Sequence, residues 1–463
     1  MSTPAIRSPL TRRKLLEVGS SAFAGLSLPG VLGRRAEAAA ESPAPRRHKS
    51  VILVLLTGGA AHQDTFDLKP EAPDTVRSDF KPIDTRTPGV QICEHLPLLA
   101  ARSDKLAIVR SMSHGDNSHL PATHTTLTGT QMPLRRASDL DNVLSRRDWP
   151  CYGAALDYVR PRRDGVPNGV TLPHRLIEGP LTWPGQHSGF LGAAHDPWEI
   201  NHDPNKPDFR VDTLTLPDGL GLERVARRHA LLQQLNEDRG RLAELAEAGE
   251  FNEQQEIALN LLTSGKVADA FRIERETAQR RDRYGRHMFG QSLLLARRLV
   301  EAGVPIVQAN MGIVQSWDTH VDNFGRLKDK LLPPLDQGVS ALLDDLSASG
   351  LLDETLVVLA GEFGRTPKIG TLPGQTIPGR DHWAHVYSTV FAGGGVRGGQ
   401  VIGRSDKTAA LPVTRSYRPE DLGATIYHAL GIVPSTEITD PLSRPLPLNR
   451  GEVIEPLFSG ARV

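Results

Sequence analysis

Cysteine and aromatic residues are scarce in this chain, and neither sign of charge is in excess. Only two of the 463 residues are cysteine, and 5% are aromatic. Two cysteines, Cys93 and Cys151, are too few for a disulfide framework or a cysteine-based zinc cluster. The 54 basic residues equal the acidic ones in number, so non-specific nucleic-acid binding has no electrostatic support. What remains is a soluble chain of one large domain or two, with 16 histidines.

Outside the N-terminus, no apolar run approaches the roughly 18 residues that a membrane span needs. Residues 1–40 hold six basic and two acidic residues, with Arg12 and Arg13 placed before an apolar stretch at 18–32. This order is typical of an export signal, and the paired arginines indicate the twin-arginine type. An ordinary secretory signal and a mobile basic tail are the alternatives. We therefore expect a signal at 1–40, a linker at 41–49, and a mature protein in the periplasm or cell envelope.

Apolar runs alternate with helical patterns along the rest of the chain. The run from Ser50 to Thr57 is apolar between its ends, which favours a strand buried on both faces of a parallel sheet. The expected strands are 50–57, 106–110, 304–310, 355–360 and 386–392, and the expected helices lie near 122–130, 139–159, 322–349 and 419–430. Residues 160–215 are expected to form a loop. Residues from about 220 to 301 are expected to form a charged helical insert. The alternation predicts an α/β sandwich over 50–463, with helices flanking a central, mostly parallel sheet.

Carboxylates and imidazoles gather next to the ends of the expected strands. In open α/β sheets, ligands bind at the carboxyl ends of the strands. Carboxylates and histidines together are the ligand set of zinc, manganese or similar divalent ions, whereas calcium and magnesium sites use little histidine. The residues in question are Asp64, Asp67, His114, Asp116, His119, His124, Asp318, His320, Asp322, Glu362, Arg365, Arg380, Asp381, His382 and His385. They predict a metal or anion site at this edge of the sheet.

Each of these residues also has a structural interpretation. Asp64 could cap the next element, and Asp318 could form a local hydrogen bond with His320. Glu362 follows a buried strand, so its carboxylate needs a partner, which Arg365 could supply.

Several segments of the chain resemble one bacterial family. They are Gln63 to Asp67 with the preceding Gly58 and Gly59, His119 to Gly129, Trp317 to His320, Gly361 to Pro367, and Gly379 to Trp383. Over about residues 50–458 the chain resembles the domain of unknown function 1501 family, within the alkaline phosphatase/sulfatase superfamily. The resemblance implies that superfamily's fold and a metal-dependent hydrolysis of sulfate or phosphate esters.

The resemblance also implies roles for single residues. The metal ligands would be Asp64 (with Asp67 nearby), Asp318, His320, Glu362, Asp381, His382 and His385. His119 stands where the superfamily places its serine, threonine or modified cysteine nucleophile, and Phe363 where it places a histidine. His119 would bind a metal or be phosphorylated, or Ser118, Thr123 or Thr125 would substitute for it.

The expected function is therefore an exported hydrolase that uses zinc or manganese, with calcium a further option. Direct attack by water activated at the metal would replace the covalent intermediate. Arg365 or Arg380 would act beside His119 by clamping the anionic ester, which could be a sulfated glycan. The alternative is a non-catalytic envelope protein that keeps the fold to bind a glycan or a protein partner, which His119 and Phe363 favour.

Overall fold

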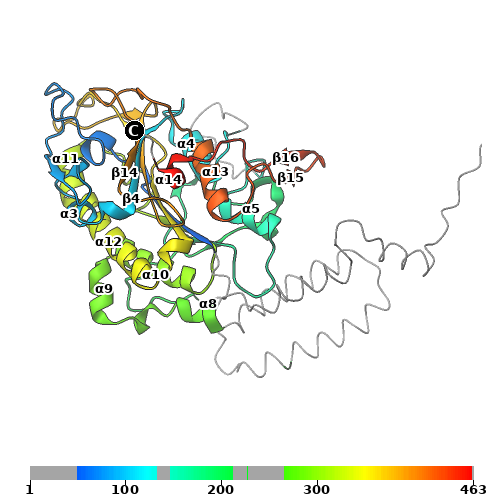
Figure 1. The fold of residues 1–463 in the computed structure, drawn as a ribbon. Helices are drawn as coiled ribbons and strands as arrows, with labels where there is room; N and C mark the ends of the chain where they lie inside the picture. Colours follow the sequence, from blue (N-terminus) through cyan, green and yellow to red (C-terminus); the bar gives the residue numbers. More distant parts are fainter. Residues whose placement is uncertain (1–48, 133–145, 212–226, 228–264, 461–463) are drawn as a thin grey trace, which may run out of the picture. The chain divides into compact units, whose positions relative to one another are not determined.

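An eight-stranded sheet runs through the middle of the protein (Figure 1). The computed structural model describes residues 49–132, 146–211, 227 and 265–460. The strand order is β14-β4-β13-β10-β1-β9-β5-β8, and within this sheet only β13 is antiparallel to its neighbours. The strands are β1 (Ser50–Leu55), β4 (Leu106–Met112), β5 (Gly169–Leu172), β8 (Trp198–Glu199), β9 (Ile306–Asn310), β10 (Thr355–Ala360), β13 (Tyr387–Ala392) and β14 (Gln400–Ile402).

The three central strands end level with one another. Leu55, the last residue of β1, pairs with Ala360 at the end of β10 and with Asn310 at the end of β9. The loops that follow these strands therefore leave the sheet at the same edge. The amino end of the antiparallel β13 lies at this edge too, because Tyr387 pairs with Met112 at the end of β4.

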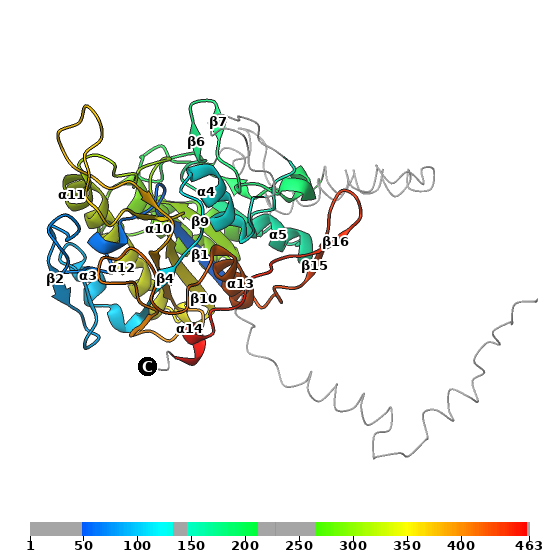
Figure 2. The same ribbon diagram turned by 90° about the horizontal axis from the view of Figure 1, so that it is seen from above.

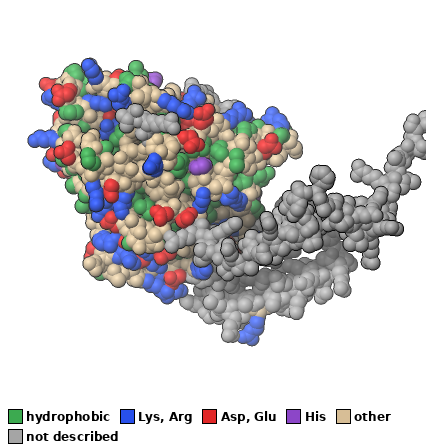
Figure 3. Space-filling model, in the orientation of Figure 1, with side chains coloured by type: hydrophobic (Ala, Val, Ile, Leu, Met, Phe, Trp, Pro, Cys, Tyr) green, Lys and Arg blue, Asp and Glu red, His purple; other side chains and the backbone are tan. Residues whose placement is uncertain are grey.

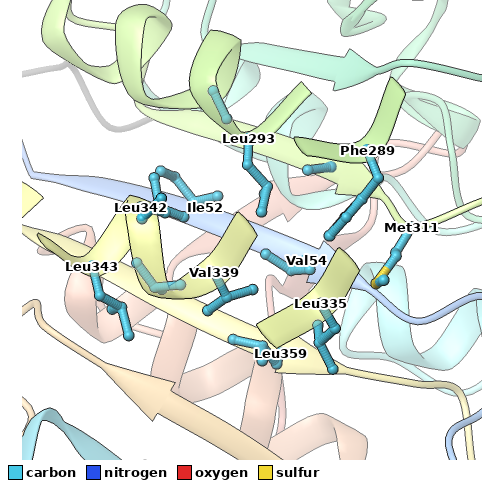
Figure 4. Close-up of a cluster of buried hydrophobic side chains, with 14 of the residues drawn as sticks. Ile52, Val54, Phe289, Leu293, Met311, Leu335, Val339, Leu342, Leu343 and Leu359 are labelled. Atoms are coloured by element: carbon cyan, nitrogen blue, oxygen red, sulfur yellow. The ribbon is translucent and has the colours of Figure 1, made fainter. Parts of the chain in front are cut away.

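Helices cover both faces of the sheet (Figures 1 and 2). Successive side chains of a strand point to opposite faces. Ile52 and Val54 of β1 face the helices α10 (Met288–Glu301) and α12 (Leu332–Ala348), and Figure 4 shows both residues beside Leu293 and Val339. The alternate residues of β1 pack into a second cluster with α4 (His119–Thr128), α5 (Tyr152–Val159) and α13 (Pro419–Ala429). Burial on both faces explains why β1 is an unbroken apolar run.

The further helices are short. They are α3 (Pro97–Ala100), α8 (Gly265–Ala270), α9 (Ala278–Tyr284), α11 (Asn323–Arg326) and α14 (Pro456–Ser459), with a π-helical turn at Leu327–Leu331. Two-stranded pairs are formed by β2 (Pro82–Asp84) with β3 (Gln91–Cys93), β6 (Ile177–Glu178) with β7 (Leu181–Thr182), β11 (Gly364–Arg365) with β12 (His382–Trp383), and β15 (Glu437–Thr439) with β16 (Pro445–Pro447). On the face drawn in Figure 3, side chains of both charges are interspersed.

The expected α/β fold with a mostly parallel central sheet is confirmed. The expectation of a loop over 160–215 was wrong in part, because β5 and β8 extend the sheet there. These strands have four and two residues, too short for a visible period. The signal expected at 1–40, residues 41–48 of the expected linker, and residues 220–226 and 228–264 of the expected helical insert lie outside the described residues. In the last part of the expected insert, α10 packs on the sheet.

Candidate metal centre

Asp318 is the point on which the polar groups of the sheet edge converge. It lies in the loop after β9, eight residues beyond the strand. Its Oδ2 accepts a hydrogen bond from His119 Nε2 at 3.2 Å, and its Oδ1 lies 3.1 Å from His382 Nε2 and 3.0 Å from His320 Nε2. Ligand-type atoms of His119, Asp318 and His382 all lie within 4.8 Å of one another. The structure thus brings residues from three distant parts of the chain to one carboxylate.

Each of the three imidazoles is held by its other ring nitrogen. His119 Nδ1 donates to Glu362 Oε1 at 2.9 Å, and His320 Nδ1 donates to Asp381 Oδ1 at 2.7 Å. His382 Nδ1 donates to the backbone carbonyl of Asn117 at 2.7 Å. All three rings consequently present Nε2 to Asp318, His119 to Oδ2 and the other two to Oδ1, and the closest mutual grouping is that of His119, Asp318 and His382. This arrangement is the one in which a carboxylate or carbonyl fixes the orientation of a metal-binding histidine.

Glu362 holds His119 from the end of β10. The side chain is 1% exposed, and both carboxylate oxygens accept from the backbone N–H of Gly58, at 2.8 and 3.0 Å. Gly58 has φ +107°, and a Cβ there would lie 2.6 Å from the backbone nitrogen of Asp318. The glycine is therefore required by both its backbone conformation and the close approach of the Asp318 loop.

Arg365 is buried beneath Asp318. Its guanidinium donates to Asp318 Oδ1 and to the carbonyls of Gly58 and Gly59, and Nη1 also lies 3.3 Å from the carbonyl of Arg380. The side chain is 0% exposed. These contacts hold the loop after β1 against Asp318 and leave no guanidinium face toward solvent. The structure therefore does not place Arg365 where it could clamp a substrate anion.

Asp64 and Arg380 form a separate buried pair. Arg380 Nε and Nη2 donate to the two carboxylate oxygens of Asp64 at 2.7 and 3.0 Å, and Asn323 Nδ2 donates to Asp64 Oδ2 at 2.9 Å. Arg380 also donates to the carbonyl of Val76 at 2.9 Å. The structure does not bring Asp64 into the cluster around Asp318, nor does it expose Arg380 to a ligand. A buried carboxylate whose oxygens are both occupied by a guanidinium is a structural ion pair.

The remaining predicted residues lie at the margin of the cluster. Asp381 is exposed and contacts the cluster through His320. His385 is also exposed, and its ring packs edge-on against Trp383 with 4.8 Å between centroids. Asp67 lies elsewhere, where it is paired with Lys69 at 2.9 Å.

The charges of the cluster shift the pKa values of the residues that form it. Burial lowers the pKa of His119, but its hydrogen bonds with Asp318 and Glu362 outweigh burial and raise the pKa to about 9. Burial raises the pKa of Asp318, but hydrogen bonds from three imidazoles, together with Arg365, bring the pKa well below its usual range. The hydrogen bond to Asp318 raises the pKa of His320. In the absence of another cation, protons therefore supply the positive charge that the carboxylates require.

A divalent ion fits these residues. When the Nδ1 atoms carry the protons, three Nε2 lone pairs face Asp318, and His320 Nε2 lies only 3.0 Å from His382 Nε2. In that protonation state these lone pairs repel one another and the carboxylate, and a cation between them would offset the repulsion. Neighbouring ligands of a tetrahedral zinc ion lie about 3.3 Å apart, since each bond is about 2.0–2.1 Å. The measured separations of 3.0–3.2 Å around Asp318 are close to that spacing.

A pocket of about 480 Å³ opens beside the cluster. His119 and His382 line it, together with Trp183 and the β6–β7 hairpin, which lies beside α4 in Figure 2. The Trp183 ring is 5.0 Å from the His119 ring, and the Phe363 ring is 4.5 Å from the His382 ring. This aromatic wall was not predicted from the sequence. A tryptophan among prolines and glycines was the available signal, but nothing local connects it with a site 64 residues away.

Fold and site together define an α/β protein with a histidine–carboxylate cluster at the carboxyl edge of its sheet. The sequence pattern of the family described as "Protein of unknown function (DUF1501)" matches residues 48–458. The chain belongs to this family, as its sequence motifs predicted. No curated protein sequence matches the chain.

Solved structures of several proteins are similar to this chain at low identity. A protein of the alkaline phosphatase superfamily from Vibrio parahaemolyticus is 10% identical, with a TM-score of 0.40, over 83% of this chain and 67% of its own. A sulfatase from a Pseudoalteromonas species is 12% identical, with a TM-score of 0.36, over 87% of this chain and 71% of its own. Murine ectonucleotide pyrophosphatase/phosphodiesterase 5 is 9% identical, with a TM-score of 0.39, over 83% of this chain and 95% of its own.

No helix of the described residues is both long enough and apolar enough to cross a bilayer.

Proposed function

We propose that the protein is a metal-dependent hydrolase of sulfate or phosphate esters, with its ion held by His119, His320, His382 and Asp318. The observation that carries the proposal is the common orientation of the three imidazoles, each anchored through Nδ1 and each presenting Nε2 to Asp318. Three imidazoles and a carboxylate suit zinc or manganese better than calcium, which takes oxygen ligands.

The ion would supply a Lewis acid for the ester oxygen and lower the pKa of a bound water. The chain's own residues orient the side chains that would bind this ion. Glu362 and Asp381 hold the imidazoles in place, while Arg365 holds Asp318. In the overall reaction the water oxygen bonds to phosphorus or sulfur, and the ester oxygen leaves with a proton. Phosphoryl transfer of this kind depends mainly on positioning and electrostatic stabilisation.

His119 is assigned here as a ligand and not as a nucleophile. In the proposal its Nδ1 stays hydrogen-bonded to Glu362, while Nε2, which faces Asp318, binds the ion. A covalent phosphoryl-histidine would need one of these nitrogens released. Direct attack by water therefore fits the geometry better than a covalent intermediate. In the same proposal, Asp64 and Arg380 stabilise the loops below the site.

The test is metal analysis of the purified full chain, followed by a panel of aryl phosphate and sulfate esters. We expect bound zinc or manganese, with metal and hydrolysis lost together in Asp318→Asn and His382→Ala. His385→Ala is the matched control, because His385 is exposed and contacts Trp383 instead of the cluster. A folded protein that takes up no metal from solutions of either ion contradicts the proposal.

A second candidate is a metal-containing binding protein without catalysis. The Phe363 ring packs against both His119 and His382, so an apolar group fills space where a further ligand could stand. Under this alternative, metal binds and Asp318→Asn loses it, but no ester is hydrolysed by the loaded protein.

The proposed site of action is the periplasm or cell envelope, reached through a twin-arginine signal. The support is the Arg12 and Arg13 pair before an apolar stretch. Replacing both arginines with lysine is expected to retain the protein in the cytoplasm. The same replacement at Arg34 and Arg35 is the control and should leave export unchanged.

A further inference from the structure

The pocket beside the candidate metal centre differs in charge from a polyanion-binding site. Its described lining includes one acidic side chain, Glu178, and no lysine or arginine. Glu178 is exposed at the tip of the β6–β7 hairpin, where Gln315 Nε2 donates to its Oε2 at 3.3 Å. A second phosphate or sulfate on a bound molecule would meet this carboxylate, with no cation in the described lining to offset it.

The two buried arginines near the cluster do not change this charge balance at the pocket. Arg365 and Arg380 are 0% and 1% exposed, and their donors are taken by Asp318, Asp64 and backbone carbonyls. Guanidinium groups that recognise sulfate or phosphate need donors directed at the ligand. Neither residue lines the pocket.

Apolar side chains line part of the pocket beside the cluster. Leu120, Pro180, Leu181 and Trp183 line the pocket, and Trp183 Nε1 is a buried donor with no acceptor among the described residues. The exposed Ile177 belongs to the same hairpin. Apolar walls with a few polar groups are typical of pockets for small molecules, and an exposed carboxylate at the rim attracts cations.

We propose that this pocket takes an ester whose single anionic group is the reacting one, attached to an apolar part that is neutral or positively charged. The proposal rests on the proposed function for the reacting group, while the pocket alone defines the rest of the ligand. It disfavours multiply sulfated glycans as substrates of this chain.

The experiment compares phenyl phosphate with its 4-trimethylammonium and 4-carboxylate derivatives, using the metal-loaded full chain. We expect kcat/KM for the first two to exceed that of the carboxylate by at least about fivefold, since one unfavourable contact between unit charges about 4 Å apart in water has about this effect. Binding of the matching phenylphosphonates, measured by calorimetry, should follow the same order.

Two variants test whether the pocket causes this order among the three esters. Glu178→Lys should improve kcat/KM and binding of the carboxylate derivatives about tenfold, whereas Glu437→Lys, at an exposed position on β15, should leave the order unchanged. Equal or better use of the carboxylate by the unmodified protein overturns the inference, as does failure of all three phosphonates to bind. If no ester is hydrolysed, the proposed function fails, and the order of phosphonate binding still decides the inference.

Discussion

The acceptors that hold the three imidazoles are chemically different. Glu362 is a buried carboxylate, Asp381 is an exposed one, and Asn117 offers a neutral carbonyl. A carboxylate acceptor raises the basicity of the ring that it holds more than a carbonyl does. His119 and His320 should therefore be stronger ligands than His382. The exposed Asp381 is the acceptor that can be altered with least damage to the fold.

Replacing Asp381 with asparagine tests this graded support. Asp381→Asn keeps a hydrogen-bond acceptor for His320 but removes the charge, so metal affinity should fall about 10- to 100-fold. Competition with a chromophoric chelator measures the change. Asp353→Asn, also exposed and outside the cluster, should leave the affinity unaltered. An unaltered affinity in Asp381→Asn as well shows that His320 is not a ligand.

A second change at the residue scale concerns the backbone of the loop after β1. Gly58→Ala places a Cβ 2.6 Å from the backbone nitrogen of Asp318 at a positive φ, and should lower the free energy of unfolding by about 3 kcal/mol. Gly374 also has a positive φ, +79°, but a Cβ there meets nothing within 4 Å, so a loss of about 1 kcal/mol is expected for Gly374→Ala. Denaturant titration of both variants measures the difference. Equal losses would mean that the Asp318 loop moves aside without cost.

At the scale of elements, α12 stabilises the sheet through its apolar face. Leu342 on this helix is 0% exposed, in the cluster that also holds Ile52 and Leu293 (Figure 4). Leu342→Ala should cost about 2–5 kcal/mol of unfolding free energy through lost burial and a cavity. Leu442→Ala, at a leucine that is 72% exposed, should change it by less than about 0.5 kcal/mol. Chemical denaturation of the two variants gives the comparison.

Strands with strong apolar runs were predictable, and so was the side chain that follows each of them. Asp318, His320, Glu362 and His382 were identified because carboxyl ends of parallel strands share an edge. The partner of a charged residue was not predictable. Asp64 and Glu362 both follow buried strands, yet one pairs with Arg380 and the other with His119. Which partner each carboxylate takes depends on the paths of loops such as 366–380. The sequence of such a loop has no periodic pattern from which its path could be predicted.

At the scale of the whole molecule, part of the acid stability should depend on one ion pair. Burial raises the pKa of Asp196, but bonds from Arg146 and Ser188 outweigh it and lower the pKa to about 2. A carboxyl group with a lowered pKa stabilises the fold above its unfolded pKa of about 3.9, and this contribution is lost as pH falls toward 2. Stability of the unmodified protein should therefore fall more steeply between pH 4 and 2 than that of Asp196→Asn. Thermal melts across this range measure the slopes, and parallel slopes would refute the assignment.

The cluster joins His119 to Asp318 across 199 residues and His382 to Asp318 across 64. An unfolded chain cannot hold these ligands together, so the complete site exists only after folding. Affinity for divalent ions follows a general order in which copper and zinc exceed manganese, whatever the protein prefers by geometry. Whichever ions surround the chain at the moment it folds therefore have first access. The compartment of folding, more than the compartment of action, would decide which metal the protein carries.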